Sequence, residues 1–399
     1  MPSLSPTTQE RLDRIKKAGT AEKPAKVSTK QQHTSSQTKK NEVRVHYDQA
    51  PLSEIPKGTV IKTNTDAYKV TGKVGGGGFG DVYVAVRAST KALCAIKAEC
   101  TGNLEEPRLE REYYVYLAIE KGNRAGKALP NLVGAYGFAN MNNKLKFIFM
   151  PLLGPSLEST IKRNRPTRST CYKAAIQMCR SVQSLHKLGY IHRDIKPANF
   201  VFESRTSYST LVLIDFGMAT HYPTKVSEIP ETSLYDFIGT LKYAPRTTHR
   251  GEPQSRKDDL ESWVYVAMEV FDFDALPWNS CQEQERVHKM KKDFFRRRAL
   301  RDTVRVFVEV LGMIEAIELC ADPPYSQIMA HLGAMALTDG CRIDGDLQFA
   351  KRETPLTDIR RAKQLDSEAR EPAGCDSEAT PYQLSSTKEV EGKVQQLTI

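Results

Sequence analysis

The chain has 399 residues, of which 40% are hydrophobic, and a formal net charge of +10 at pH 7. This length allows one large domain or two ordinary domains with tails, and the hydrophobic content is sufficient for a sizeable core. The eight cysteines are dispersed without a C-x-x-C pair, which argues against a disulfide framework or a structural zinc site. The sequence has no run of 18 apolar residues and no signal-peptide core, so we expect a soluble, cytoplasmic protein without a transmembrane segment.

The positive charge is concentrated near the N-terminus. Residues 1–44 contain ten Lys and Arg residues and four acidic residues, so they carry six of the ten net charges. This segment is rich in Ser, Thr and Gln and cannot bury enough apolar surface to offset its ordering entropy. We predict a disordered basic arm over residues 1–58, which is either a solvated tail or a docking arm for an acidic partner.

The first ordered elements are predicted to be antiparallel strands. Order is expected to begin near residues 62–70, and alternating patterns over 68–74 and 80–88 are typical of strands on either side of a glycine run. Residues 91–99 are a third strand candidate. These patterns predict a small strand-rich lobe.

The remaining elements are predicted to be mostly helical. Apolar residues at helical spacing indicate a helix over 106–122, and Gly122 is interpreted as its end. Residues 145–154 predict a buried strand and an extended connector. Further helices are predicted over 169–189, 258–271 and 301–319. The polar composition that follows predicts a weakly ordered tail over 341–399.

A glycine run, VGGGGFGDVY, lies between the first two predicted strands. Gly75, Gly77 and Gly80 satisfy G-x-G-x-x-G, and Val82 follows two residues later. Glycines allow backbone amides to approach phosphate oxygens, although a flexible turn alone would also explain such a run. No helix is predicted directly after Gly80, unlike in a dinucleotide-binding loop, so the context favours a flap over nucleotide phosphates.

The second candidate motif is CAIK, which ends at Lys97. Lys97 lies on a predicted strand whose other residues are apolar, so its ammonium group needs a buried partner. The helix predicted over 106–122 offers Glu112 on its core face, with Glu110 as the alternative. An isolated A-I-K would more often contain a snorkelling surface lysine, but the upstream glycine run favours the buried interpretation.

The stretch YIHRDIKPANFVF places three polar side chains between apolar clusters. Asp194 can accept a hydroxyl proton, Lys196 can lie beside a developing phosphoryl charge, and Asn199 can offer an oxygen to a divalent cation. Asp215 ends the apolar stretch LVLID, where a carboxylate is costly unless a cation or hydrogen-bond donors satisfy it. Together with the glycine run, these residues predict a site for a magnesium–nucleotide complex.

H-R-D-x-K-x-x-N, D-F-G, A-I-K and the glycine run together resemble the eukaryotic protein kinase signature. The stretches LLGPSLE, GTLKYAP, HRGEPQSRKDDLESW and LPW are similar to the casein kinase I group, and HRDIKPANF resembles its tau-tubulin kinase branch. The resemblance covers roughly residues 60–340. It implies an α+β, bilobal protein kinase fold with a kinase domain over 59–340. The implied parts are an N-lobe over 59–150, a hinge over 151–154 and a C-lobe over 155–340.

The resemblance implies transfer of the γ-phosphoryl group of ATP, with Mg²⁺ or Mn²⁺ as the metal. It assigns Asp194 as the catalytic base and Lys196 as the contact to the γ-phosphate. Lys97, braced by Glu112, would hold the α- and β-phosphates. The implied metal ligands are Asn199 and Asp215.

The resemblance also implies the nucleotide pocket. Met150 would lie at the back of the adenine pocket, and Pro151 would begin the hinge. Proline has no N–H group, but kinases use only the carbonyl at that position and take the amide from two residues later, here Leu153. The implied nucleotide contacts are Gly75, Gly76, Gly77, Gly78, Phe79, Gly80, Val82, Ala95, Lys97, Met150, Pro151 and Leu153.

Ser/Thr specificity is implied by the Asp-Ile-Lys-Pro stretch and by Thr240, which would touch the catalytic Asp and Lys. Asp259 matches an acid that supports the catalytic loop. Arg246 follows an Ala-Pro pair where ordinary kinases have the glutamate of A-P-E, a glutamate that the casein kinase I group also lacks.

Three basic residues are candidates for a substrate anion pocket. Lys242 and Lys289 fall at positions that bind acidic or phosphorylated substrate residues in the casein kinase I group, and Arg193 lies nearby. We hypothesise protein substrates with Ser/Thr near acidic or phosphorylated residues. The alternative is that the three are unrelated surface cations.

The sequence leaves two functions other than catalysis open. A catalytically weak kinase-fold scaffold would normally have lost one of the motif residues, and none is missing. A binding protein that uses the basic arm is the third alternative. The basic stretch over 289–298 indicates a solvated helix face beside the substrate groove, with a nuclear or nucleic-acid patch as the alternative, so a nuclear location stays open. We expect a monomer.

Overall fold

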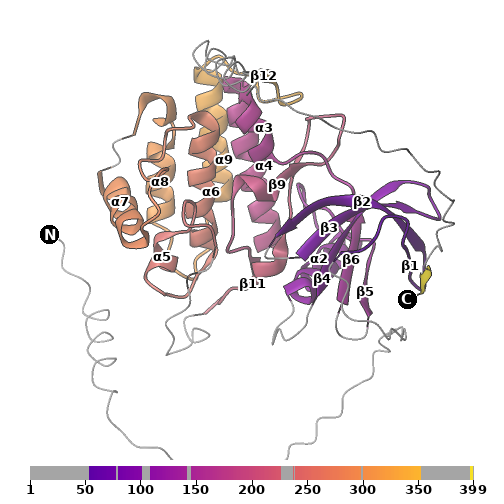
Figure 1. Cartoon of the computed structure of the whole chain (residues 1–399). Helices are drawn as coiled ribbons and strands as arrows, with labels where there is room; N and C mark the ends of the chain where they lie inside the picture. The colour runs from indigo at the N-terminus through magenta and orange to yellow at the C-terminus, as the bar shows by residue number, and fades with distance from the viewer. Residues whose placement is uncertain are drawn as a thin grey trace, which may run out of the picture. The chain divides into compact units, whose positions relative to one another are not determined.

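The computed structural model describes most of the chain between residues 54 and 351. The described residues are 54–77, 80–100, 108–141, 145–225, 237, 239–297, 300–351 and 396–398. Most of the arm predicted over 1–58 therefore lies outside them, as do residues 352–395 of the predicted tail. Figure 1 shows a strand-rich part in indigo and purple and a helical part in magenta and orange, which confirms the predicted α+β class.

The strand-rich part is a seven-stranded sheet with the order β13-β1-β2-β3-β4-β6-β5. Its strands are β1 (Val60–Lys62), β2 (Ala67–Gly77), β3 (Gly80–Arg87), β4 (Leu93–Cys100), β5 (Gly137–Met141), β6 (Leu145–Pro151) and β13 (Gln396–Thr398). β1 to β6 pair antiparallel, and β13 pairs parallel with β1. The three strands predicted around the glycine run are confirmed as β2, β3 and β4.

The central strand β4 sends alternate side chains into two environments because side chains alternate along a strand. Cys94 and Ile96 are fully buried in a small hydrophobic core on one face. Lys97 lies on the other face, where its register partners are Val82 on β3 and Ile148 on β6. Ile148 belongs to the main core. The lysine is therefore directed toward the helical part of the molecule.

The helix that follows, α2 (Arg108–Arg124), shows that the prediction of its end at Gly122 is wrong. Gly122 lies inside the helix, and a Cβ atom there would come within 2.7 Å of Leu129. The end is formed by Gly126, which has φ +73°, and the Lys127 amide bonds the Gly122 carbonyl at 3.0 Å. This is a Schellman motif, in which a glycine in the left-handed region follows the last helical turn.

Helices α4 and α6 form the centre of the helical part, and their predicted positions are confirmed. The N-terminus of α6 is stabilised by a capping box between Ser255 and Asp258. The helices are α3 (Leu157–Arg163), α4 (Arg168–His186), α5 (Arg246–His249), α6 (Arg256–Phe271), α7 (Gln284–Arg297), α8 (Phe307–Glu315) and α9 (Tyr325–Thr338). The shorter elements are β7 (Asn164–Pro166), β8 (Tyr190–Ile191), η1 (Pro197–Asn199), β9 (Phe200–Phe202), β10 (Leu211–Leu213), η2 (Phe216–Met218), β11 (Thr220–His221), η4 (Asp302–Val304) and β12 (Phe349–Lys351).

The single helix predicted over 301–319 is wrong in its extent. Only α8, Phe307–Glu315, is α-helical there. Its last carbonyl, that of Glu315, accepts from the distant Lys257 ammonium at 2.8 Å, and the same ammonium donates to the Ile317 carbonyl beyond the helix at 3.0 Å. A helix can end where such a partner replaces the missing intrahelical bonds.

Both predicted ends of the domain need correction. Order begins before residues 62–70, because Ile55 is already buried in the small core and its amide donates to the Tyr83 hydroxyl at 3.1 Å. The tail predicted to begin at residue 341 is packed up to Lys351. Leu347 is buried in the main core, and the Lys173 ammonium donates to the Asp344 carbonyl at 3.0 Å.

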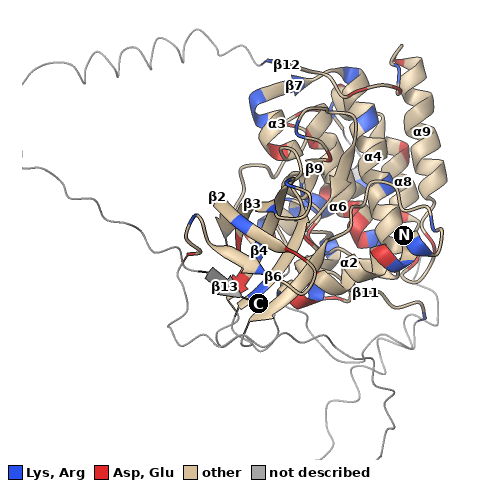
Figure 2. Cartoon of the chain, turned by 90° about the vertical axis from the view of Figure 1, so that its right-hand side faces the viewer, with Lys and Arg blue, Asp and Glu red and all other residues tan. Residues whose placement is uncertain are grey.

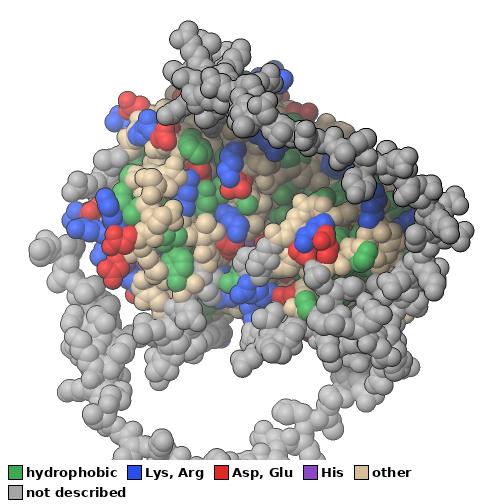
Figure 3. Space-filling view, in the orientation of Figure 1, with side chains coloured by type: hydrophobic (Ala, Val, Ile, Leu, Met, Phe, Trp, Pro, Cys, Tyr) green, Lys and Arg blue, Asp and Glu red, His purple; other side chains and the backbone are tan. Residues whose placement is uncertain are grey.

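Lys and Arg positions (blue) and Asp and Glu positions (red) alternate along the helices and strands in Figure 2. The exposed side chains of α7 are mostly basic and include Lys289, Lys292 and Arg296, with acidic side chains between them (Figure 3). None of the described helices is long and apolar enough to cross a membrane.

Candidate active site

The first part of the site is a buried lysine between two carboxylates. Lys97 on β4 donates to Glu112 on α2 at 2.6 Å and to Asp215 at 2.8 Å. The expected pairing with Glu112 is thus present, and the alternative, Glu110, instead contacts Lys146 on β6. The Lys97 and Glu112 side chains are only 11% and 2% exposed, so water weakens this ion pair little.

The electrostatics favour the charged forms of Lys97 and Asp215. Burial opposes ionisation of the lysine, but the carboxylates of Glu112 and Asp215 outweigh it, so the pKa of Lys97 lies above its ordinary value. Burial also opposes ionisation of Asp215, and Lys97 beside it holds the pKa of Asp215 below its ordinary value. The lysine is therefore a fixed positive charge at the junction of sheet and helix.

The second part of the site is the loop after β8, which carries Asp194. Both carboxylate oxygens of Asp194 accept hydrogen bonds, one from the Thr240 hydroxyl at 3.0 Å and one from the Lys196 ammonium at 2.6 Å. The Asn199 side-chain amide donates to the Asp194 carbonyl at 2.8 Å. The orientation of the Asp194 carboxylate is thus determined by two neighbouring donors.

The Asp194 loop is held from below by Asp259 on α6. The carboxylate of Asp259 accepts the amides of His192 (2.6 Å) and Arg193 (3.0 Å), as expected for an acid that supports this loop. It also bonds the His186 ring at 2.8 Å. Burial opposes ionisation of Asp259, but its bond with His186 and the loop amides outweigh it, so the pKa of Asp259 lies below its ordinary value.

Asn199 and Asp215 are suitably placed to hold a divalent cation. The Ile214 amide donates to the Asn199 carbonyl at 3.0 Å, which joins the two segments. Asn199 uses its amide nitrogen on Asp194, so its side-chain oxygen is left for a hard cation, and Asp215 has a second carboxylate oxygen beyond the one on Lys97. No three His, Cys, Asp or Glu side chains of the described chain are grouped as metal ligands. A cation here would take its remaining ligands from phosphate oxygens and water.

The glycine run forms the tip of the β2–β3 hairpin. Gly75 pairs with Val82, and Gly77 pairs with Gly80. Gly80 has φ +105°, and a Cβ atom there would lie 2.3 Å from the Ala98 carbonyl, so only glycine fits. Gly78 and Phe79 lie outside the described residues. The prediction that no helix follows Gly80 is confirmed, and β2 extends through Gly77, so part of the run lies within the strand.

Three of the other predicted nucleotide contacts, Val82, Ala95 and Met150, lie on the sheet face of Lys97. Ala95 and Met150 are register partners on β4 and β6, and Ala95 shares the face of Lys97 because it precedes it by two residues. Pro151 ends β6, and Leu153 follows in the connector, where it is half-buried. The sheet face beside Lys97 therefore presents small and apolar side chains.

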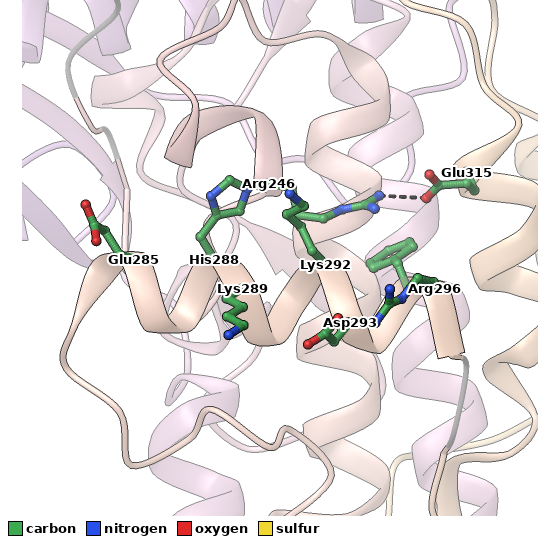
Figure 4. A pocket seen from close by; sticks show the side chains of 9 residues that line it. Arg246, Glu285, His288, Lys289, Lys292, Asp293, Arg296 and Glu315 are labelled. Atoms are coloured by element: carbon green, nitrogen blue, oxygen red, sulfur yellow. Dashed lines mark hydrogen bonds and ion pairs between the residues drawn. The ribbon is translucent and has the colours of Figure 1, made fainter. Parts of the chain in front are cut away.

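The three residues predicted to form an anion pocket lie in different settings. Lys242 donates to Glu269 at 2.7 Å, and the Arg193 side chain donates to the Met218 carbonyl at 2.7 Å. Lys289 lines an open pocket along α7 together with Lys292 and Arg246 (Figure 4). Lys242 is thus already neutralised by a buried glutamate.

The sequence interpretation missed two basic side chains that hold the segment after Thr240. Arg246 donates to Glu261 on α6 at 3.0 Å and to Glu315 on α8 at 2.7 Å, the second bond being drawn in Figure 4. Lys291 on α7 donates to backbone carbonyls of the same segment. The helical spacing of Lys291 from the buried Val287 was the available signal for its inward position.

Comparison with known proteins agrees with this geometry. The family described as "Protein kinase domain" matches residues 68–320 of the chain. Among solved structures, one titled "Structure of vaccinia related kinase 3" superimposes with a TM-score of 0.64 at 21% sequence identity. The match covers 73% of this chain and 94% of that chain. At this identity the likeness shows the fold alone, and it confirms the predicted bilobal architecture.

Proposed function

The chain belongs to the protein kinase domain family, and from this premise we propose that it transfers the γ-phosphoryl group of ATP to serine and threonine side chains of proteins. The observation that carries the proposal is the joint placement of Lys97 between Glu112 and Asp215, and of Asp194 beside Thr240 and Lys196. A scaffold that only binds partner proteins would not need both the charged groups around Lys97 and those around Asp194.

In this proposal each group has a separate task. Asp194 accepts the proton of the substrate hydroxyl, and its bonds to Thr240 and Lys196 keep its carboxylate oriented. Lys97 neutralises phosphate charge, and Asn199 and Asp215 would hold the Mg²⁺ ion. The bound Mg²⁺–ATP supplies the phosphoryl group and a Lewis acid. The protein contributes mainly positioning and charge stabilisation.

The nucleotide assignments follow from the same premise. We propose that the β2–β3 hairpin covers the phosphates and that Val82, Ala95 and Met150 pack against adenine. Hydrogen bonds to adenine would come from the connector that begins at Pro151. The kinase domain, predicted over 59–340, would extend to Lys351, because Leu347 is buried in the main core and β12 (Phe349–Lys351) pairs with β7.

We also propose the substrate specificity and the kinase group of the protein. Ser/Thr specificity is supported by the Thr240 bond to Asp194. We propose membership of the casein kinase I group from LLGPSLE, GTLKYAP, HRGEPQSRKDDLESW and LPW, and of its tau-tubulin kinase branch from HRDIKPANF. A preference for acidic or phosphorylated sites is supported by the exposed Lys289 and Lys292 on α7. We propose a cytoplasmic location.

The test is Mg²⁺-dependent transfer from labelled ATP to casein and to an acidic Ser/Thr peptide. Asp194→Asn removes the proton acceptor and is expected to lower the rate by about a thousandfold or more. Asp274→Asn, an exposed position, is the matched control and should retain wild-type activity. Transfer that persists in Asp194→Asn would refute the assigned base.

Two further outcomes separate the remaining alternatives. Wild-type protein that binds Mg²⁺–ATP without transfer would favour the scaffold. In a second test, the acidic residues of the peptide are replaced by glutamine. An unchanged kcat/KM would refute the acidic-site preference but not the kinase activity.

A further inference from the structure

Lys291 occupies a position on α7 that an apolar residue would normally fill. Its neighbours Lys289 and Lys292 are exposed, whereas the Lys291 side chain is 0% exposed. It lies on the buried face of α7 together with Val287 and Phe295, four residues to each side. Lysine is almost never fully buried without a partner, so this one requires an explanation.

The ammonium group of Lys291 is held by backbone oxygens. It donates to the carbonyls of Leu241 at 2.8 Å and Ala244 at 2.6 Å, and it lies 3.3 Å from a ring nitrogen of His249. The rings of Tyr265 and Trp278 lie 5.3 Å and 5.5 Å away and present further favourable surfaces to a cation. Within the described chain, Lys291 has no salt bridge with a carboxylate.

Both carbonyls belong to one tight turn that also carries Thr240. The amides of Tyr243 and Ala244 each donate to the Thr240 carbonyl at 2.8 Å. The indole of Trp278 donates to the carbonyl between the two that Lys291 binds, also at 2.8 Å. The turn therefore depends on donors from the α7 region, and at its other end the Thr240 hydroxyl bonds Asp194.

We propose that Lys291 is a positioning residue for the phosphoryl acceptor, acting through the turn over residues 240–244 to place Thr240 against Asp194. This inference rests on the proposed kinase function. An apolar side chain at this position would fill the same space but leave two buried carbonyls without donors. A lysine is therefore required by the turn rather than by the packing of α7.

The burial of Lys291 also affects its protonation. Burial lowers the pKa of Lys291 to about 7, and the charge of Glu261 only partly opposes this change. Loss of this proton leaves an amine with two N–H groups, so both carbonyls keep a donor as the pH rises above neutrality.

The first experiment compares Lys291→Met with Lys292→Met in the full chain. Lys292 is exposed on the same helix and serves as the matched control. Lys291→Met should lower kcat/KM for the acceptor peptide by roughly ten- to a hundredfold, with the KM for ATP unchanged within about twofold. Kinetic constants of Lys291→Met that equal those of the control would overturn the proposal.

A double-mutant cycle with Thr240→Val tests the route of the effect. If Lys291 acts through Thr240, Lys291→Met should change kcat/KM much less in the Thr240→Val background than in the wild type. Equal fold-changes in both backgrounds would show that Lys291 acts elsewhere, and the proposal would be wrong.

A measurement without activity separates this inference from the proposed function. Amide hydrogen exchange at Tyr243 and Ala244 should accelerate in Lys291→Met and stay unchanged in Lys292→Met. If wild-type protein transfers no phosphate, this exchange still decides whether Lys291 holds the turn. Lys291→Gln, which retains two N–H donors, provides a milder variant if Lys291→Met does not fold. Unchanged exchange in both Lys291 variants would overturn the proposal.

Discussion

At the scale of single residues, Lys97 is held by the carboxylates of Glu112 and Asp215, and substitution of Glu112 measures the contribution of one of them to catalysis. We expect Glu112→Gln to lower kcat/KM for ATP roughly a hundredfold, because the lysine loses the partner that holds it at the sheet. Steady-state kinetics at varied ATP would measure this. Glu120→Gln on the same helix removes only an exposed pair with Arg124 and should leave kcat/KM within about twofold of wild type. Comparable losses in both variants would contradict the assignment.

Lys291 predicts a pH dependence of stability with a definite sign. Its pKa is about 7 in the folded state and near 10.4 in an unfolded chain. Between these values the unfolded state binds more protons, so this residue makes the free energy of unfolding rise with pH. The contribution approaches about 1.4 kcal/mol per pH unit. Urea unfolding at pH 7.5 and 9 should show a larger rise in the free energy of unfolding for wild-type protein than for Lys291→Met. The same rise in both proteins would refute the prediction.

The residues differ in how far the sequence could predict them. Glu112 was favoured over Glu110 because helical periodicity places it on the core face, and that is a local property. Lys291 was missed because a lysine in a basic run is usually solvated, and only its contacts with a turn some 50 residues away distinguish it. Arg246 was noted in the sequence, but its ion pair was not predicted because the partner Glu261 comes from another helix.

At the scale of elements, the end of α2 matters because this helix carries Glu112. Gly126→Ala should lower the free energy of unfolding by about 1–2 kcal/mol, since φ +73° is unfavourable for alanine although the space is open. Gly134 is also in open space without a positive φ, so Gly134→Ala is the control and should be neutral or slightly stabilising. Chemical denaturation of both variants provides the measurement. Equal stabilities would mean that Gly126 does not determine the helix end.

Element types were easier to predict than element ends. Periodicity of two and of 3.6 residues identified β2, β3, β4, α4 and α6 because burial of one face leaves a local pattern. The end of α2 is formed by Gly126, whereas the glycine at position 122 lies inside the helix because a Cβ atom there would meet Leu129. The end of α8 depends on a distant partner, since Lys257 reaches the Glu315 carbonyl.

At the scale of the whole molecule, residues 341–351 add contacts to the helical core. Leu347 is buried, and Lys173, which is only 6% exposed, donates to carbonyls of this segment. A chain ending after Gly340 should therefore be less stable than one ending after Lys351 by at least about 2 kcal/mol. Thermal and urea unfolding of the two truncated chains would measure the difference. Equal stabilities would show that the segment does not contribute to the fold.

The sequence by itself determined the residues of the candidate site and the class of fold. The motifs around Lys97, Asp194 and Asp215 are short and local, and the strands and helices that carry them have clear periodicities. Beyond the pair of Lys97 and Glu112, tertiary structure alone decided which charged side chains meet which partners. Lys291 with the turn after Thr240, Arg246 with Glu261, and the packing of residues 341–351 all join segments far apart in the chain. Burial of a charged or polar group depends on such partners, and a local pattern cannot identify them.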